Sequence, residues 1–418
     1  MQNGMRVSSS ARSVAVIGAG AAGVMSAIHA AGAGADAAVV ERTDDGCRKI
    51  LISGGGRCNL LPLSLDEKKF FTNSSRNTLK KIVRSWPLPA VRKFFECEAG
   101  ILLADELETE KVFPASGRAA VVRNKLMSLA KARGVRMIMN ACVTRILPEG
   151  GKWIIEENGK IILEADALVI ATGGLAAPKT GSDGSGLALL EELGYEIVPT
   201  FPALTSLLSD SPIYSGLAGI SLNAAITAIC GKKRTFAVGG FLFTHRGYSG
   251  PAVLEISHEA VKAIQNSEKN FRLLADWNSI SEEEWRESIE FGRKSNLTVA
   301  GLISRKIPSR LAERLMKIAC VNPSRLLAHL TRAERERLID CLVRCELPVS
   351  GYLGYDSAEV TAGGVALSEI NPKTMESRRH RGLYFCGELL DAFGAVGGYN
   401  FFWAWATGRL AGMSAAKK

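Results

Sequence analysis

Three glycines and one glutamate near the N-terminus have the types and the spacing of a dinucleotide-binding site. Gly18, Gly20 and Gly23 follow a short apolar run at residues 13–17, and Glu41 stands 23 positions after Gly18. Gly18 permits a tight turn, Gly20 lets a pyrophosphate approach the backbone, and Gly23 lets the following helix pack on the strand. The helix N-terminus offers free N–H donors to the phosphates, and the carboxylate of Glu41 can accept hydrogen bonds from ribose hydroxyls. We therefore expect a bound dinucleotide here.

Three later segments decide between FAD and NAD, because both cofactors share the glycine fingerprint. Residues 169–174 form an apolar run followed by a turn of small residues, and residues 384–388 form another, with Asp391 shortly after it. Residues 397–400 open a final apolar helix at 401–411. A nicotinamide-binding domain needs no such C-terminal return, whereas FAD extends towards a late helix N-terminus, whose N–H groups can stabilise negative charge on the N1/O2 edge of the flavin. The sequence therefore predicts non-covalently bound FAD.

The apolar runs also predict the elements that carry these residues. Four short runs are typical of parallel strands buried on both faces: residues 13–17, 37–41, 167–171 and 382–386. The predicted fold class is α/β, with a doubly wound, glutathione-reductase-like FAD-binding domain interrupted by an inserted β-subdomain plus a helical subdomain. We place the discontinuous FAD-binding domain at 13–195 and 350–418. The inserted substrate domain takes 196–349, divided into a β-rich part, 196–251, and a helical part, 252–349.

Composition excludes several classes of protein. Of the 418 residues, 47% are hydrophobic and 22% are charged, which excludes a disordered chain, collagen and a coiled coil. The nine cysteines include no C-x-x-C pair, so we expect a reducing compartment, no metal site and no thiol–disulfide reductase. The apolar stretch at 14–40 contains five glycines, and we interpret it as a strand–helix–strand unit rather than a membrane span. The first dozen residues lack the apolar core of a signal peptide, and we expect a cytoplasmic protein without a membrane partner.

A longer motif is similar to that of a known family. Residues 48–59, Arg-Lys-Ile-Leu-Ile-Ser-Gly-Gly-Gly-Arg-Cys-Asn, resemble the R-K-x-L-x-S-G-x-G-R-C-N signature of the BaiN/RdsA-type flavoproteins, which belong to the two-dinucleotide-binding-domain superfamily. Residues 112–116, 243–251, 360–365 and 382–400 resemble further signatures, so the resemblance extends over 13–412. The chain departs from the family pattern at Cys47, at Leu61-Pro62 and at Ala395-Val396.

The resemblance implies an FAD-dependent oxidoreductase in which NAD(P)H reduces the flavin and the flavin reduces a polarised C=C bond. Uracil in ribosomal RNA, which would become dihydrouridine, is the favoured substrate. A steroid-like or bile-acid-like enone is the first alternative. An amine oxidase of the aminoacetone type and a non-catalytic RNA-binding flavoprotein are further alternatives.

The candidate site residues come from the motifs together with the resemblance. Backbone N–H groups of residues 53–56 can form an anion-binding nest, and Arg57 can make a bidentate contact to phosphate or substrate. Cys58 is expected to be a packed thiol. His245 and Tyr248 are, with Arg57, the candidate catalytic residues, because imidazole and phenol can donate a proton. The expected FAD contacts are Gly18, Gly20, Ala21, Ala22, Gly23, Glu41, Arg42, Arg48, Lys49, Ser53, Gly54, Gly55, Gly56, Arg57, Cys58, Asn59, Val143, Ala171, Thr172, Gly173, Gly174, Gly387, Glu388, Asp391, Gly397, Gly398, Tyr399 and Asn400.

Positive charge is concentrated in two segments. The net charge is +10, and residues 286–344 contain 13 Lys and Arg against 6 Asp and Glu. Residues 72–95 add six more cations and no acid. Either these are solvated helix faces, or they form a footprint for an RNA backbone. RNA bound through the basic inserted helices is thus a candidate partner.

Overall fold

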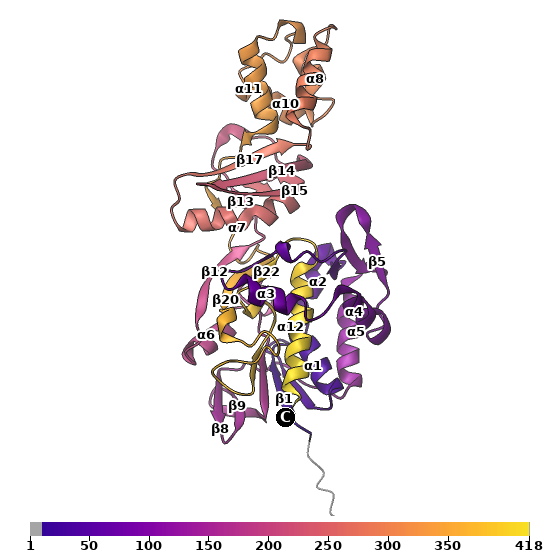
Figure 1. The fold of residues 1–418 in the computed structure, drawn as a ribbon, viewed down its shortest axis with the longest axis vertical. Coiled ribbons are helices and arrows are strands. Elements are labelled where there is room, and N and C mark those ends of the chain that lie inside the picture. The colour runs from indigo at the N-terminus through magenta and orange to yellow at the C-terminus, as the bar shows by residue number, and fades with distance from the viewer. Residues whose placement is uncertain (1–10, 418) are drawn as a thin grey trace, which may run out of the picture. The chain divides into compact units, whose positions relative to one another are not determined.

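The computed structural model describes residues 11–417, which divide into two compact units (Figure 1). Unit 1 combines the chain up to Phe201 with the chain from Val360 onwards, and unit 2 comprises Pro202–Glu359. Each unit has a hydrophobic core of its own. Among the described helices, none is both long and apolar enough to cross a membrane.

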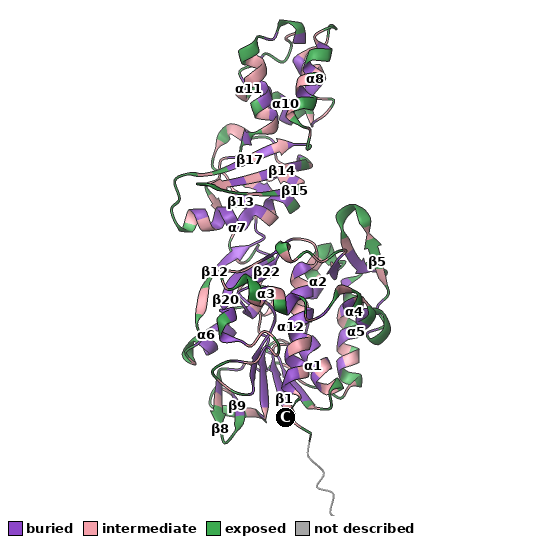
Figure 2. Ribbon diagram, in the orientation of Figure 1, coloured by how far each residue is buried: buried purple, intermediate pink, exposed green. Residues whose placement is uncertain are grey.

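A five-stranded parallel sheet forms the centre of unit 1. Its strand order is β21 (Leu383–Phe385), β11 (Ala167–Ile170), β1 (Ser13–Ile17), β2 (Asp36–Val40) and β7 (Arg136–Ile138). The inner strands are almost entirely buried, as Figure 2 shows, which explains why their sequences are continuous apolar runs. All four strands predicted from such runs are present. The predicted fold class is therefore confirmed for this unit.

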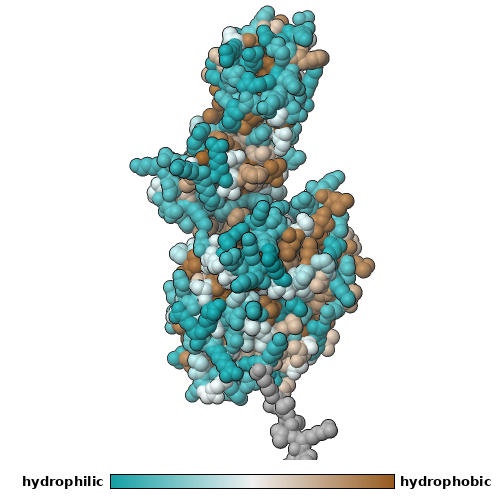
Figure 3. Space-filling view, viewed as in Figure 1, coloured by the Kyte–Doolittle hydropathy of each residue, from teal (hydrophilic) through white to brown (hydrophobic). Residues whose placement is uncertain are grey.

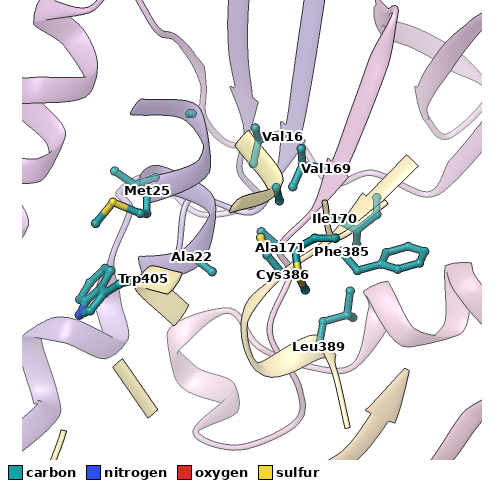
Figure 4. Close-up of a cluster of buried hydrophobic side chains, with 14 of the residues drawn as sticks. Val16, Ala22, Met25, Val169, Ile170, Ala171, Phe385, Cys386, Leu389 and Trp405 are labelled. Carbon is teal, nitrogen blue, oxygen red and sulfur yellow. The ribbon is translucent and has the colours of Figure 1, made fainter. Parts of the chain in front are cut away.

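Helices α1 (Ala21–Gly32) and α12 (Tyr399–Ala415) pack closely against each other. A Cβ atom at Gly408 would overlap the carbonyl oxygen of Ala22, and a Cβ at Gly412 would overlap that of Ser26. Glycines in α12 therefore permit the two helix backbones to approach. Figure 4 shows the core beneath them, where side chains from β1, α1, β11, the segment after β21 and α12 meet. The C-terminal helix thus completes the domain that the N-terminal strand begins.

Smaller elements surround the central sheet. Three antiparallel strands form one side layer: β8 (Arg145–Glu149), β9 (Lys152–Glu157) and β10 (Lys160–Ala165). The remaining strands of unit 1 are β3 (Leu61–Pro62), β4 (Phe70–Phe71), β5 (Leu103–Glu106), β6 (Lys111–Pro114), β12 (Ile197–Ala203), β20 (Val360–Val365) and β22 (Phe393–Gly394). Its other helices are α2 (Arg48–Ile52), α3 (Arg76–Val83), α4 (Leu88–Lys93), α5 (Ala119–Ala132) and α6 (Ser185–Glu192). Strand β22 pairs with β4, and β20 pairs with β12, so the C-terminal part of the chain is hydrogen-bonded to earlier segments.

Unit 2 contains a seven-stranded antiparallel sheet and five α-helices. The strand order is β18 (Cys345–Glu346), β17 (Phe271–Trp277), β14 (Ser221–Cys230), β15 (Lys233–Phe243), β16 (Gly247–Ser249), β13 (Leu207–Leu208) and β19 (Gly351–Tyr352). The helices are α7 (Pro251–Gln265), α8 (Glu282–Gly292), α9 (Val299–Ile303), α10 (Ser309–Ile318) and α11 (Arg332–Val343). Helices α8 and α11 each begin with a capping box, Ser281 with Glu284 and Thr331 with Glu334.

One sequence-based expectation for this unit is wrong. Residues 252–349 were expected to be helical, but β17 and β18 lie within them. Strand β17 buries Leu273, Ala275 and Trp277 on one face and pairs with β14, which precedes it by more than forty residues in the chain. Cys345 begins β18 and does not continue the helix of Cys341. The alternation of apolar and polar residues in β17 extends over only seven residues, which was too short to indicate a strand between two segments of helical composition.

Candidate functional site

In the glycine turn between β1 and α1, packing of the protein requires two of the glycines but not the third. Gly18 has a φ of 99°, and a Cβ there would lie 2.6 Å from the carbonyl oxygen of Ala171. A Cβ at Gly23 would overlap the carbonyl oxygen of Gly18. Gly20 differs, because its φ is −73° and nothing lies within 4 Å of a Cβ placed on it. Packing therefore explains Gly18 and Gly23 but leaves Gly20 open to a ligand.

Gly20 is also the N-cap of α1, and the end of this helix is free of competing side chains. No side chain caps it, and its first turn contains no acid. The unpaired N–H groups at the start of a helix attract phosphate oxygens. The turn thus has both the space and the donors that a pyrophosphate requires.

Glu41 lies beside this turn, immediately after β2. Its Oε2 accepts a hydrogen bond from the backbone N–H of Ala19 at 2.6 Å, and its Oε1 accepts from the backbone N–H of Thr43 at 2.9 Å. These contacts hold the buried carboxylate against the glycine turn, where a ribose joined to the pyrophosphate would lie.

The loop before α6 reaches the same corner, which the sequence did not predict. Asp183 forms an ion pair with Arg42, and Gly181 lies against Thr43. Residues 181–184 lead into α6, which has Gly184 as its N-cap. The opposite charges of Asp183 and Arg42 were the only signal in the sequence for this contact.

The segment after β11 carries a buried polar atom without a partner. The hydroxyl oxygen of Thr172 is shielded from solvent and has no hydrogen-bond partner among the described residues. Buried hydroxyls are normally hydrogen-bonded, so this atom can serve a ligand. Next to it, Gly174 packs against Thr361, whose hydroxyl accepts from the N–H groups of Leu175 at 2.7 Å and Ala176 at 2.9 Å. Val143, the remaining predicted contact of this region, is almost fully buried.

The motif at residues 48–59 forms helix α2 and an exposed glycine turn. Gly54, Gly55 and Gly56 have φ values of 55°, 65° and 83°, so three successive residues adopt the left-handed conformation and expose their backbones. Arg57 follows, with its guanidinium carbon 4.0 Å from the ring centroid of Phe113 and its Nη1 2.9 Å from a carboxylate oxygen of Glu106. The turn therefore presents backbone N–H groups and one oriented guanidinium to solvent.

Charged and thiol groups behind this turn have internal partners. Lys49 pairs with Glu388 at 2.6 Å, and the other carboxylate oxygen of Glu388 accepts from the N–H of Thr361 at 2.9 Å. Arg48 pairs with the acids of the preceding loop. Cys58 is fully buried, and burial raises the pKa of its thiol to about 12. This agrees with the expectation of a packed thiol.

The C-terminal motif forms the uncapped start of α12. Gly397 and Gly398 have φ values of 120° and 88°, and no side chain caps the helix. The side-chain amide of Asn400 exchanges two hydrogen bonds with the backbone of Gly394, at 2.8 and 2.9 Å, and the hydroxyl of Tyr399 donates to the carbonyl of Ser64 at 3.0 Å. Asn59 can accept from the N–H of Gly398 at 3.0 Å. Residues 59–64 and 394–400, which include the departures at Leu61-Pro62 and Ala395-Val396, therefore support the same helix start.

Asp391 has a different role from the glycines near it. Its buried carboxylate accepts hydrogen bonds from Thr72, Asn73 and Ser74. Burial raises the pKa of this carboxyl, and these donors oppose the rise. Asp391 thus fixes the 72–74 turn, and the contacts in the structure give it a positioning role.

The two candidate catalytic residues of unit 2 have opposite environments. His245 is exposed in the loop between β15 and β16. Tyr248 is 1% exposed, packs among Tyr214, Phe241 and Phe243, and donates a hydrogen bond to Ser209 at 3.2 Å. Burial raises the pKa of Tyr248 to about 12. Tyr248 is therefore part of the hydrophobic core, whereas the side chain of His245 is accessible to a substrate.

Most cations of residues 286–344 already have partners. Five arginines form ion pairs within unit 2: Arg286, Arg293, Arg325, Arg335 and Arg344. Arg310 and Arg314 donate to the carbonyl oxygens of Gly216 and Ser215. Four cations form no ion pair or side-chain hydrogen bond with a described residue: Lys294, Arg305, Lys317 and Arg332. Apart from Glu282, the acids in these pairs are already included in the count for the segment, so its net charge stays positive, but most of its cationic side chains are held by partners within unit 2.

The cofactor-site residues of unit 1 fit FAD. Space at Gly20, an uncapped helix start, a buried unpartnered hydroxyl at Thr172 and a second uncapped helix start at Gly398 are features that the protein's own packing leaves unused. No group of three or more His, Cys, Asp or Glu that could hold a metal occurs among the described residues.

Comparison with known proteins identifies the family. The profile of the HI0933-like protein Rossmann domain matches residues 12–414. The chain belongs to this family. It is an FAD-dependent oxidoreductase, and the resemblance inferred from residues 48–59 is confirmed.

Relatives of known activity span the full chain. A 3-dehydro-bile acid delta(4,6)-reductase from Clostridium scindens is 31% identical over 97% of this chain and 99% of its own length. A ribosomal RNA dihydrouridine synthase from Haemophilus influenzae is 31% identical over 96% of this chain and 98% of its own length. A solved 3-ketosteroid delta1-dehydrogenase from Sterolibacterium denitrificans has a TM-score of 0.52 and 12% identity, and the match covers 97% of this chain and 99% of that one. The last shares the fold.

Proposed function

We propose that this chain is an NAD(P)H-driven reductase of a polarised C=C bond, with uracil in ribosomal RNA as its first candidate substrate. The observation that carries the proposal is the start of α12, where Gly398 is the N-cap, no side-chain cap is present and the first turn contains no acid. When bound, FAD supplies the hydride chemistry that connects a nicotinamide with an electron-poor alkene. The start of α12 can stabilise negative charge on the reduced ring.

Protein side chains supply the remaining parts of such a reaction. Arg57, oriented by Phe113 and Glu106, can hold the carbonyl oxygen that polarises the double bond. His245 is the first candidate proton donor, because its side chain is exposed and an imidazole can donate a proton. Tyr248 is the weaker candidate, since its hydroxyl is buried and already donates to Ser209.

The substrate is proposed from the relatives and from the surface charge. Ribosomal RNA dihydrouridine synthases of Haemophilus influenzae and Escherichia coli are both 31% identical to this chain. A small enone is the second candidate. It is favoured by the equally similar bile acid reductase and by the ion pairs and hydrogen bonds within unit 2 that engage most cations of residues 286–344. Three large apolar side chains close in sequence to Arg57 or to its partner Glu106 are exposed and would suit such a ligand: Ile52, Leu102 and Leu107. Figure 3 shows hydrophobic residues in brown among hydrophilic ones on the visible face.

The deciding experiment tests the cofactor on the purified protein and the two candidate substrates in the cell and in the test tube. The purified protein should release FAD on denaturation, and NADH or NADPH should bleach its flavin absorbance. Dihydrouridine mapping of ribosomal RNA from a strain without the protein should then show one missing modification. A plasmid encoding the wild type should restore it, and His245→Ala should restore it poorly. Intact modification together with turnover of a steroid-like enone would select the second candidate. Amine-dependent flavin reduction with peroxide release would contradict both.

A further inference from the structure

One face of the unit 2 sheet is covered by protein, and the other is open. Strands alternate their side chains between faces. On the covered face, Ala224, Ile226, Ala237 and Leu273 are fully or almost fully buried in the core that includes α7. The opposite face carries Phe236, which is 74% exposed, and Val238, which is 59% exposed. Large apolar side chains at these exposures on neighbouring positions of one face are not explained by packing within unit 2.

The register of the three long strands orders this open face into rows. Phe236 of β15 lies opposite Thr227 of β14, which lies opposite Leu274 of β17. The preceding row is Arg234, Ile229 and Arg272, and both arginines are exposed. An aromatic side chain thus stands one row, or two residues along the strand, from a pair of guanidinium groups. The row beyond it contains Val238, Ala225 and the partly buried Asp276.

The guanidinium groups of this face are available to a ligand. Arg272 is 3.2 Å from Glu346, but both side chains are more than half exposed, so water and salt screen this pair strongly. No ion pair or hydrogen bond joins the side chain of Arg234 to another described residue. Lys232, in the turn between β14 and β15, is exposed at the same end of the sheet. The charge of this end is therefore positive.

We propose that this open sheet face, defined by Arg234, Phe236, Val238 and Arg272, binds single-stranded RNA. A base stacks on the ring of Phe236, and adjacent phosphates lie against the two arginines. Aromatic side chains on an antiparallel sheet beside cationic groups suit unstacked bases, because every base has a face for stacking and each nucleotide carries one phosphate. The inference rests on the proposed ribosomal RNA substrate and assigns the surface that holds it.

A second copy of the chain is a poorer occupant of this face. The two apolar side chains together expose on the order of 200–300 Å². A stable protein interface needs about 800 Å² per partner, with a core depleted of charge. A small apolar centre edged by arginines suits a nucleotide better than a self-complementary interface.

The test measures RNA affinity with the flavin-loaded protein. Anisotropy of a short fluorescein-labelled oligouridine is recorded against the wild type, Phe236→Ala and Phe291→Ala. Phe291 is the matched control, because it is an equally large side chain, 81% exposed, on α8. Phe236→Ala should weaken binding about tenfold or more, the loss expected when one base loses its aromatic partner. Phe291→Ala should bind like the wild type, and Phe236→Trp should retain the affinity.

Salt dependence tests the second part of the surface. For single strands the log–log slope of affinity against salt changes by about 0.7 for each phosphate contact. Arg234→Ala and Arg272→Ala should each flatten the slope by one contact. Charge reversal of Arg305, Lys317 and Arg332, three of the four unpaired cations of residues 286–344, should change it less than these two substitutions do.

Failure of this inference and failure of the proposed function give different results. Equal RNA affinity of the wild type and Phe236→Ala, with dihydrouridine still formed in the cell, would overturn the surface and leave the function intact. RNA binding that depends on Phe236, without any missing modification in the deletion strain, would support the surface and contradict the substrate. A dimer that dissociates on Phe236→Ala, with no RNA binding, would make the face a self-interface and overturn the proposal.

Discussion

Replacing Gly20 with valine should abolish FAD binding and leave the apoprotein folded. The backbone at Gly20 has φ −73°, a conformation open to any residue, and a Cβ there meets no atom within 4 Å. The change replaces a tolerated helix N-cap by a poor one, which costs about 1 kcal/mol. The new side chain fills the space through which a pyrophosphate would reach the N–H groups of α1. A loss of affinity of at least 100-fold, or about 2.7 kcal/mol, is expected.

Gly23→Ala gives the contrasting result, because its Cβ would overlap the carbonyl oxygen of Gly18. Relieving that overlap requires backbone movement and should cost at least about 3 kcal/mol of unfolding free energy. Gly354→Val is the matched control, since Gly354 lies in unit 2, also has nothing within 4 Å of its Cβ position and has no left-handed φ. It should keep both stability and FAD.

Two measurements on each variant decide the matter. The flavin-to-protein ratio after reconstitution reports binding, and urea unfolding of the apoprotein, followed by tryptophan fluorescence, reports stability. Gly20→Val should have almost no flavin and a midpoint close to that of the wild-type apoprotein. Stoichiometric FAD in Gly20→Val would show that the phosphates do not use this turn. A midpoint as low as that of Gly23→Ala would show that the space at Gly20 is not free.

Three further substitutions or treatments test other parts of the structure. Burial raises the pKa of Asp276 to about 6, so this carboxyl binds its proton more tightly in the folded chain, and stability should fall as pH rises from about 4 to about 6. Asp276→Asn should remove that pH dependence and, after allowance for partial exposure, raise stability by about 1–2 kcal/mol at pH 8, measured by urea unfolding. Glu388→Gln should destabilise unit 1 by about 1–2 kcal/mol by leaving Lys49 unpaired, and adding Lys49→Met should cost less than the sum of the single changes. Iodoacetamide at pH 8 should label exposed Cys97 within minutes and leave Cys58 unlabelled until the chain unfolds, as peptide mass spectrometry can check, because burial keeps the thiol of Cys58 protonated.

Local patterns were enough to predict the cofactor domain. The strands at 13–17, 37–41, 167–171 and 382–386 are apolar throughout because both of their faces are buried, so each is visible without knowledge of its neighbours. The glycine turn is equally local, because its conformation depends on a few consecutive residues. The family motif at 48–59 added the class of reaction.

Charge could not be interpreted in the same way. The sequence shows how many cations a segment contains, but an ion pair such as Arg286 with Glu336 joins residues of different helices. Arg310 and Arg314 bind carbonyl groups nearly a hundred residues earlier in the chain. The segment 286–344 therefore keeps its excess of positive charge, but most of its cationic side chains already have a partner within unit 2.

The sequence by itself determined the parallel sheet, the glycine turn, the position of Glu41 and the membership of an FAD-binding family, because these depend on periodicity and spacing within short segments. Tertiary structure alone decided that β17 is a strand, that Tyr248 belongs to a core, that Asp391 holds the 72–74 turn and that Asp183 meets Arg42. It also decided that Phe236 faces outwards on an open sheet. Each of these depends on a partner far away in the chain, and the choice among possible partners is made by the packing of the whole unit.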